Sequence, residues 1–541
     1  MEMPATYALR QARTEALLAS FLAAAAAAAL VATAPPGVDA PAHLYRTLLV
    51  RDGIHVWDNL WFAGQYPLAS YSLLYYFPAA IVGNERLAFA AVVLSAGLFA
   101  LLVTREWGEA GRWPARVFAL LAIGPLFTGS YGYALGLTAL LATLVAAQWG
   151  RTWLAIPLGA LTLGFSPLAF VFLCMVLLAG ALGRRRLTRR ALVLGGGLVV
   201  AAALEATALA AFPSASRYPF RAFELVAVLT TCVLGAALAS RASRGETLVA
   251  FFALWALVSI AGFLVPSPFG ENLTRLRLLA FPLMLLTAVL ARFRPRLLAF
   301  AALAFALGYN TVPYVGDVVR ADARTPARSY WAPALGFLRE HADPEYRVEV
   351  VPTAHHWESY WVPRAGFALA RGWYRQLDLA ENEVLYERTL SPVTYRRWLR
   401  RMGVRFVLLP SARLDTQGAE KEATLLRSRR SGLVPVFRTP DWRIYELRPA
   451  VPLLTGPAPA RITALGHERI AGWTGGRGSY LLRVNYTGYW KVVRGRVCVA
   501  RAPGGMTMLR SIRAGRFTLV LKEGPVRIVR SAFGARSAAC P

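Results

Sequence analysis

Lysine and acidic residues are scarce in this 541-residue chain. Only three of its 60 basic residues are Lys (Lys421, Lys491 and Lys522), and 30 acidic residues leave a net charge of +30. Such a charge is typical of proteins that bind nucleic acid, but no nucleic-acid motif and no basic face accompany it. In the first 314 residues, Arg clusters instead in short loops between apolar runs. The charge therefore does not indicate a nucleic-acid partner.

Cysteine is also rare, and four Cys are too few for a disulfide framework. Cys174 and Cys232 lie within apolar runs, where Cys packs as a small apolar residue. Cys498 and Cys540 both fall in the polar C-terminal part of the chain. They could pair if that part lies outside the cell, because oxidising compartments permit disulfides.

Charge is missing from long stretches of the first 314 residues, and the whole chain has a mean hydropathy of +0.43. The first apolar run, 16–34, is long enough to span a bilayer and longer than the core of a cleavable signal peptide. Beyond Gly316 no run could span. The sequence predicts an α-helical polytopic domain with about eleven spans, near 16–34, 86–103, 117–130, 131–149, 152–165, 167–183, 191–212, 222–240, 247–265, 276–291 and 297–314.

The distribution of Arg predicts the orientation of these spans. With the N-terminus in the cytoplasm, the cytoplasmic loops carry most of the Arg and the outer loops far fewer, as the positive-inside rule requires. The C-terminal region then lies outside. The segment Leu68–Val82 is apolar but short, aromatic and interrupted by Pro78, and counting it as a span would reverse every later loop. It is therefore interpreted as a helix at the outer interface.

Three domains follow from these patterns. Residues 1–316 are predicted to form the transmembrane domain, with a first outer loop at 35–85. Residues 317–448 indicate an extracytoplasmic α/β domain, with helices at 334–341 and 392–402 and strands at 348–351, 406–410 and 442–446. Residues 449–541 begin with a Pro-rich linker and predict a small β-sandwich, with strands at 480–486, 495–500, 516–521 and 526–530. The richness in Arg and Ala is typical of a bacterial genome of high GC content, so the expected location is the bacterial plasma membrane.

Asp39 is the first candidate for a catalytic residue. It closely follows the first span, and an acid so near to lipid is costly unless it has a function. As a general base it would accept the proton of an acceptor hydroxyl. His43, one helical turn further, would orient Asp39 or contact phosphate. The structural alternatives are Asp39 as the N-cap of a helix from Ala40 to Gly53, and His43 as a polar interfacial residue. The other titratable groups of the loop are expected to be solvated: Asp52, His55 and Asp58.

Four residues at outer ends of spans are candidates for binding the substrate: Tyr131, Glu271, Asn272 and Arg275. Tyr131 lies in a short turn between paired spans, which is consistent with helices that stop short around a cavity. Arg275 carries a planar guanidinium that suits a phosphate. The alternative is an Arg that extends to the membrane interface and pairs with Glu271, four residues before it.

Four further candidates lie in the polar C-terminal region: Trp357, Glu358, Arg371 and Trp373. In the functional interpretation they form a rim of aromatic and charged groups that covers the membrane site and holds sugar. In the alternative, His355–Glu358 is a polar loop that packs against the next helix. The two adjacent His are not spaced as metal ligands on a helix.

A long outer loop after the first span, with an acid in the loop and an aromatic interfacial helix after it, resembles the polytopic GT-C glycosyltransferases. Several short motifs resemble a GT-C-like group of bacterial membrane proteins labelled "6-pyruvoyl-tetrahydropterin synthase-related". These motifs are Asp39-x-x-x-His43 with Gly64-Gln-Tyr-Pro67, Gly270-Glu-Asn-x-x-Arg275-Leu with Phe281-Pro-Leu, and the stretches 347–358 and 370–378. The label is not taken as an activity, because a pterin synthase needs a set of zinc-binding His and the six His here are scattered.

The resemblance implies a membrane glycosyltransferase that transfers a sugar from a polyprenyl-phosphate carrier to a glycan, lipid or protein acceptor of the cell envelope. A divalent cation, Mg²⁺ or Mn²⁺, is left open as a cofactor. GT-C enzymes often carry paired acids in the first loop, whereas Ala40 follows Asp39 here, which puts metal dependence in doubt. Two other classes compete with this hypothesis: a transporter or flippase for a lipid-linked precursor, and a non-catalytic envelope-assembly protein that binds glycan.

Overall fold

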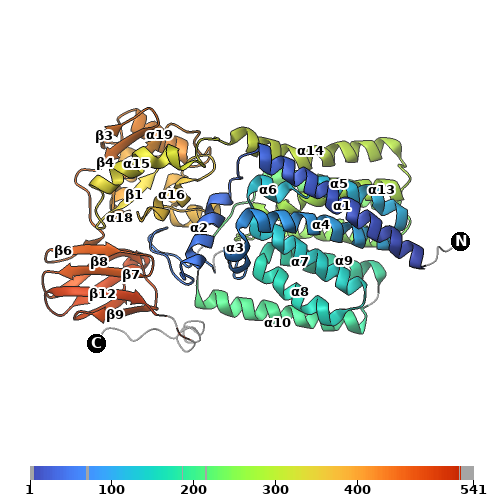
Figure 1. The fold of residues 1–541 in the computed structure, drawn as a ribbon, viewed down its shortest axis with the longest axis horizontal. Coiled ribbons are helices and arrows are strands. Elements are labelled where there is room, and N and C mark those ends of the chain that lie inside the picture. Colours follow the sequence, from blue (N-terminus) through green and yellow to red (C-terminus); the bar gives the residue numbers. More distant parts are fainter. Residues whose placement is uncertain (1–4, 69–71, 186, 214–215, 523, 525–541) are drawn as a thin grey trace. The chain divides into compact units, whose positions relative to one another are not determined.

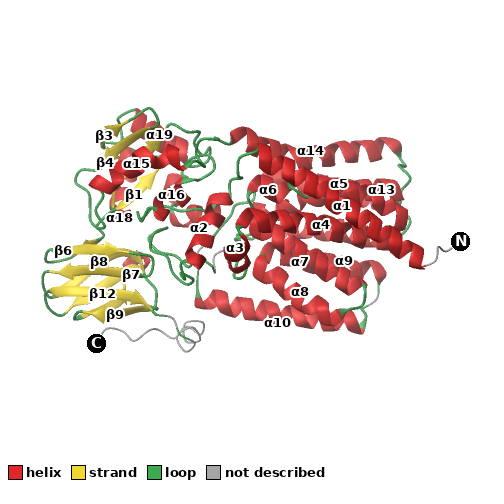
Figure 2. Cartoon of the chain, in the orientation of Figure 1, coloured by secondary structure: helices red, strands yellow, loops and turns green. Residues whose placement is uncertain are grey.

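The computed structural model describes residues 5–68, 72–185, 187–213, 216–522 and 524. The chain forms two compact units, each built from several segments. The first unit comprises Met1–Ala40, Tyr71–Ala206 and Arg217–Val319, and its described residues form helices and loops (Figures 1 and 2). The second unit comprises Pro41–Ser70, Thr207–Ser216 and Arg320–Pro541, and it contains the strands.

Among the described residues, nine stretches are helical, long and apolar enough to cross a membrane: Leu9–Thr33, Asn84–Thr128, Tyr131–Gln148, Pro167–Arg184, Arg189–Ala211, Ala222–Ala239, Glu246–Leu264, Gly270–Leu290 and Arg296–Arg320. They indicate a multi-pass membrane protein. The helices that build them are α1 (Ala5–Thr33), α4 (Asn84–Trp107), α5 (Arg112–Leu121), α6 (Gly124–Thr128), α7 (Tyr131–Gln148), α9 (Pro167–Arg184), α10 (Arg189–Ala211), α11 (Ala222–Ala239), α12 (Glu246–Leu264), α13 (Ala280–Leu290) and α14 (Arg296–Arg320).

The stretch Asn84–Thr128 folds back on itself. A 3₁₀ turn, η1 (Gly108–Gly111), separates α4 from α5, and α5 packs against both α4 and α1. Arg116 of α5 donates to Glu15 in the first half of α1, at 2.7 and 3.0 Å. The Thr128 carbonyl, at the end of α6, accepts from the Asp39 amide beyond the end of α1. The segment α5–α6 therefore runs parallel to α1. With the shorter apolar helix α8 (Thr152–Phe165), each of the eleven predicted spans corresponds to a helical segment.

The aromatic segment before α4 forms only a short helix. Helix α3 (Tyr76–Val82) has seven residues, or about 10 Å at 1.5 Å per residue. The hydrocarbon core of a bilayer is about 30 Å thick, so α3 is too short to cross it. This agrees with leaving the segment out of the predicted spans.

An α/β domain occupies the first part of the long C-terminal segment. Its four-stranded sheet has the order β1-β2-β4-β3, in which β1 and β2 are parallel and the other pairs antiparallel. Buried side chains of helix and sheet, among them Trp398, Leu399 and Val407, form its core. Its elements are α15 (Arg328–His341), β1 (Arg347–Val350), α16 (Glu358–Arg364), α17 (Arg375–Glu381), η3 (Glu383–Leu385), α18 (Pro392–Met402), β2 (Val404–Pro410), α19 (Ala419–Arg427), β3 (Val434–Arg438) and β4 (Trp442–Glu446).

Two antiparallel four-stranded sheets follow, with the orders β10-β11-β8-β5 and β6-β7-β12-β9. Leu482 and Leu509 from the first sheet share one apolar core with Ile470, Phe517 and Leu519 from the second, so the sheets pack face to face as a sandwich. The elements are β5 (Leu454–Thr455), β6 (Ala460–Leu465), β7 (Arg469–Thr474), β8 (Gly478–Asn485), β9 (Trp490–Arg494), β10 (Val497–Arg501), η4 (Pro503–Gly505), β11 (Met506–Ser511) and β12 (Gly515–Leu521).

Two expectations about the end of the chain lie outside the described residues. Cys498 is on β10, but its predicted partner Cys540 is beyond the described part. The predicted strand at 526–530 is also beyond it. Both stay predictions.

The segment Pro41–Ser70, interpreted from the sequence as a membrane-domain loop, packs with the C-terminal region. It begins with most of α2 (Ala40–Arg51). Trp61 Nε1 donates to the Ser359 carbonyl at 3.0 Å, and Asn59 Nδ2 donates to the Gly466 carbonyl at 2.8 Å. The segment thus contacts both the α/β domain and the sandwich.

One expectation about this segment is wrong. Asp58 is not solvated but fully buried, whereas Asp52 and His55 are exposed as predicted. The Asp58 carboxylate accepts hydrogen bonds from the Tyr45 hydroxyl at 2.9 Å and the Leu60 amide at 3.0 Å, and it pairs with His467 Nδ1 at 2.8 Å. These partners replace the water that the charge would otherwise need.

Candidate functional site

The structure brings together two predicted site residues of the first unit that are 236 positions apart. Arg275 Nη2 donates to Asp39 Oδ2 at 2.8 Å, and the two side chains are 24% and 9% exposed. The Arg275 guanidinium also lies 6.0 Å from the ring centroid of Tyr133, near the start of α7. Asp39 directly precedes α2, as a cap would, but its carboxylate forms this ion pair with Arg275.

Arg275 lies on a 3₁₀ helix, η2 (Gly270–Leu279), which is unusually long for its type at ten residues. Three residues per turn place Asn272 and Arg275 on one face and Glu271, Thr274 and Arg277 on the next. The predicted alternative, an i,i+4 pair between Glu271 and Arg275, needs an α-helix and is not formed. Glu271 instead pairs bidentately with Arg221.

The charged residues around η2 are otherwise satisfied. Arg277 pairs with Glu224 at 3.0 Å and donates to the Thr274 carbonyl at 3.0 Å. Asn310 of α14 donates to the Arg277 carbonyl at 2.7 Å, which ties η2 to the last apolar helix. Asn272 is partly buried. This end of the first unit therefore holds three Arg–carboxylate pairs, and among the three arginines Arg221 and Arg275 keep the more exposed side chains.

Tyr131 begins α7 and is almost completely buried. It follows Gly129, whose φ of +70° is in the left-handed region, and a Cβ at this Gly would lie 2.5 Å from the Ala40 amide nitrogen. The turn between α6 and α7 therefore needs Gly to approach the backbone next to Asp39. The sequence marked this turn, although the close approach was not predictable from it.

His43 belongs to the second unit and is fully buried. Both of its ring nitrogens lie 3.3 Å from the Tyr374 hydroxyl. One turn along α2, Arg46 is also fully buried, and its guanidinium lies over the rings of Tyr374, at 4.7 Å, and Trp61, at 5.8 Å. None of its three guanidinium nitrogens has a hydrogen-bond partner among the described residues. A buried charge without a partner is rare, so Arg46 joins the site candidates.

Arg46 was missed because the sequence shows only one more Arg in an outer loop. Its spacing of three from His43 was the available signal, since residues three apart share a helix face. Tyr374 was missed because it is adjacent in sequence to the predicted Trp373 and carries no motif of its own.

The four predicted residues of the α/β domain are interior side chains. Trp357, Glu358, Arg371 and Trp373 are each at most 6% exposed. Glu358 accepts from the Thr353 amide at 3.1 Å and pairs with His356 Nδ1 at 3.0 Å, while Trp373 stacks on the His356 ring. They build the inside of this domain in the described structure, and their contact with sugar stays a prediction.

Arg371 is surrounded by three carboxylates. Its guanidinium nitrogens lie 2.8 Å from Glu349, 3.1 Å from Glu422 and 3.5 Å from Asp378. Burial raises the pKa of Glu349 well above its ordinary value and also raises the pKa of Glu422. One guanidinium cannot balance three buried carboxylates, so the site favours a protonated carboxyl beside Arg371.

Within the described residues, no three His, Cys, Asp or Glu side chains are grouped so that they could hold a metal ion. The arrangement is still compatible with a cation that Asp39 and the phosphate of a donor bind together. The divalent cation therefore stays a prediction. No protein-family model matches the chain, and no curated protein is significantly similar to it.

Proposed function

We propose that this protein is a membrane glycosyltransferase of GT-C type. It transfers a sugar from a polyprenyl-phosphate carrier to a cell-envelope acceptor at the outer face of the membrane. The observation that carries the proposal is the Asp39–Arg275 ion pair. The residue types predict two different roles, a base for Asp39 and a phosphate ligand for Arg275. The two side chains are nevertheless in contact, at one end of the first unit.

In this proposal Arg275 binds the donor phosphate and Asp39 acts as the base. A donor phosphate competes with Asp39 for the Arg275 guanidinium, because both are anions that accept its hydrogen bonds. The released Asp39 carboxylate then accepts the proton of the acceptor hydroxyl. The acceptor oxygen forms a bond to the anomeric carbon, the bond from that carbon to the phosphate oxygen breaks, and its electrons leave with the phosphate that Arg275 binds.

The outer location is supported by the way the second unit is assembled. Its segments Pro41–Ser70, Thr207–Ser216 and Arg320–Pro541 pack together, so they must lie on one side of the membrane. Six crossing segments separate the first two (α4, α5–α6, α7, α8, α9 and α10), and four separate the last two (α11, α12, η2–α13 and α14). Both numbers are even, as packing on one side requires. The Arg-rich loops then lie on the opposite side, which the positive-inside rule assigns to the cytoplasm.

The test is sugar transfer by the full-length protein in proteoliposomes, supplied with polyprenyl-phosphate mannose, glucose or galactose as donors and an envelope extract as acceptor. Asp39→Asn should reduce the transfer rate about 10²- to 10⁴-fold, the usual contribution of a general base. Asp52→Asn is the matched control, because Asp52 is exposed in the same loop region. It should transfer at the wild-type rate. Full activity of folded Asp39→Asn would disprove the assigned role.

Arg275 gives a second, different readout. Arg275→Lys keeps the charge but loses the planar fork, so it should raise the KM for the donor more than it lowers kcat. Arg275→Gln removes the charge as well, so it should raise the KM for the donor further and also lower kcat. If neither variant changes the KM, Arg275 serves only to neutralise Asp39.

A further inference from the structure

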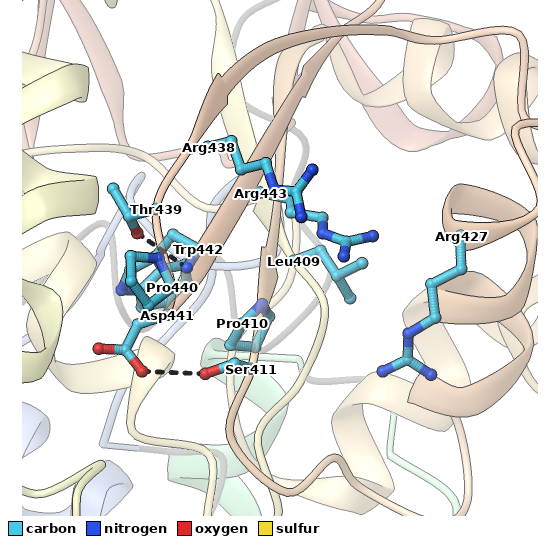
Figure 3. A pocket seen from close by; sticks show the side chains of 10 residues that line it. All are labelled: Leu409, Pro410, Ser411, Arg427, Arg438, Thr439, Pro440, Asp441, Trp442 and Arg443. Atoms are coloured by element: carbon cyan, nitrogen blue, oxygen red, sulfur yellow. Dashed lines mark hydrogen bonds between the residues drawn. The ribbon is translucent and has the colours of Figure 1, made fainter.

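The α/β domain contains a pocket of about 680 Å³ that plays no part in the proposed transfer (Figure 3). The end of β2, the turn between β3 and β4, and the last residue of α19 form its walls. Its volume lies within the range of roughly 300–1,000 Å³ that is usual for small-molecule sites. Its lining residues are Leu409, Pro410, Ser411, Arg427, Arg438, Thr439, Pro440, Asp441, Trp442 and Arg443.

Three arginines face this pocket. Arg438 and Arg443 are direct partners in the antiparallel register of β3 and β4. Figure 3 shows their guanidinium groups side by side, pointing to the side on which Arg427 of α19 lies. Like charges directly opposite each other on neighbouring strands destabilise a sheet. Both side chains are exposed, so water screens part of this repulsion, and an anion bound between them would relieve it further.

The protein itself supplies little compensation. Among the described residues, neither Arg438 nor Arg443 forms an ion pair. Arg427 has a long contact of 3.8 Å with Glu420, and both of those side chains are about half exposed. Exposed ion pairs of this kind contribute little to the stability of a protein.

Asp441 is the acid in the pocket lining, and it is engaged elsewhere. Its carboxylate accepts from the Ser411 hydroxyl at 3.0 Å and pairs with Arg324 at 3.2 Å. In Figure 3 it points away from the three guanidinium groups. The concave surface between the arginines is thus strongly positive and lacks a counter-ion from the described chain.

We propose that this pocket binds a phosphate-bearing ligand, either a diphosphate or a sugar phosphate. A phosphate presents oxygens in several directions and can accept from guanidinium groups on both sides of the pocket, whereas one carboxylate is satisfied by a single Arg fork. The space exceeds that of one phosphate, so a second phosphate or a sugar fits with it. This site is independent of the transfer chemistry at Asp39.

Isothermal titration of the full-length protein in detergent, at low ionic strength, tests the site with inorganic pyrophosphate and with glucose 1-phosphate. The wild type should bind at least one of them. The double substitution Arg438→Gln with Arg443→Gln should weaken binding at least tenfold. The matched control is Arg397→Gln with Arg401→Gln, which removes two exposed charges from α18 of the same domain. It should change the Kd less than twofold.

Thermal unfolding distinguishes a lost ligand site from a damaged fold. Without ligand, the Arg438/Arg443 double variant should melt at the wild-type temperature or above it, because a repulsive pair is removed. Pyrophosphate should raise the melting temperature of the wild type and of Asp39→Asn, but not that of the double variant. Failure of the wild type to bind either probe, or equal binding by the double variant, would overturn the proposal.

Discussion

Arg46 and Arg371 are both buried arginines, but their surroundings are opposite. Arg46 has no hydrogen-bond partner in the described chain, whereas Arg371 faces three carboxylates. A buried charge without a partner is unfavourable, so an apolar side chain of similar size in its place relieves that cost, while removing one partner of a buried pair costs about 3–5 kcal/mol. The same substitution should therefore have opposite effects at the two positions.

We expect Arg46→Met to melt at the wild-type temperature or a few degrees above it, and Arg371→Met to melt far below it or fail to fold. Thermal unfolding of the purified full-length variants checks both, with the exposed Arg397→Met as a control that should not change. If Arg46 binds an anionic group of the donor, Arg46→Met should also lose sugar transfer despite its stability. A marked loss of stability in Arg46→Met would show that its contacts with Tyr374 and Trp61 outweigh its desolvation.

The segment Pro41–Ser70 is held to the sandwich by a pair that responds to pH. Burial alone would lower the pKa of His467. The hydrogen bond to Asp58 and the charge of Asp58 outweigh this effect, so the pKa of His467 lies above its ordinary value. A raised His pKa adds stability that is fully present below about pH 6.5, the value for an unfolded chain. That stability is lost as pH rises through the higher, folded-state pKa.

The wild type should therefore lose thermal stability as the pH rises above about 6.5 and His467 gives up its proton. Asp58→Asn removes the charge that holds the proton, so its melting temperature should be lower at pH 6 and should vary less with pH. Melting curves measured at pH 6 and at higher pH compare the two proteins. The same pH dependence in both would exclude the pair as its source.

At the level of helices and strands, apolar length and turn chemistry made much of the fold predictable. Helix α18 has the predicted bounds because Ser391 caps it, Pro392 opens it and Gly403 ends it. Strand β4 also has the predicted bounds. Strand β3 of the α/β domain and strands β5, β6, β7, β9 and β11 of the sandwich were missed, because short strands that contain Arg or Gly show weak alternation of apolar and polar residues.

The site was predictable only in part. The choice of Asp39 and Arg275 came from their residue types and their distance from the spans, but their contact across 236 positions was not visible in the sequence. The expected Glu271–Arg275 pair failed because η2 is a 3₁₀ helix, and a periodicity of three is difficult to distinguish from 3.6 over ten residues. The burial of arginines such as Arg46 and Arg371 was not predictable either, because a polar sequence context predicts exposed side chains.

The even numbers of crossings between the parts of the second unit lead to a prediction for the whole molecule. Ser411 is exposed in the α/β domain, and Ser243 is exposed in the Arg-rich turn between α11 and α12. In intact cells, a membrane-impermeant maleimide should label Ser411→Cys above the wild-type background. Ser243→Cys should be labelled only after the cells are permeabilised. Labelling of Ser243→Cys in intact cells would reverse the orientation and remove the outer location of the site.

The contacts of Pro41–Ser70 with distant parts of the second unit also determine when this protein can finish folding. The hydrogen bond from Asn59 to the Gly466 carbonyl cannot form until Gly466, 407 residues later in the chain, has been synthesised. At a synthesis rate of 5–20 residues per second the delay is roughly 20–80 s. During that time Trp57, almost fully buried in the finished protein, lacks its contact with Trp490 of the sandwich. We therefore expect a product that stops short of the sandwich to keep part of this aromatic segment exposed and to be degraded faster than the full-length protein.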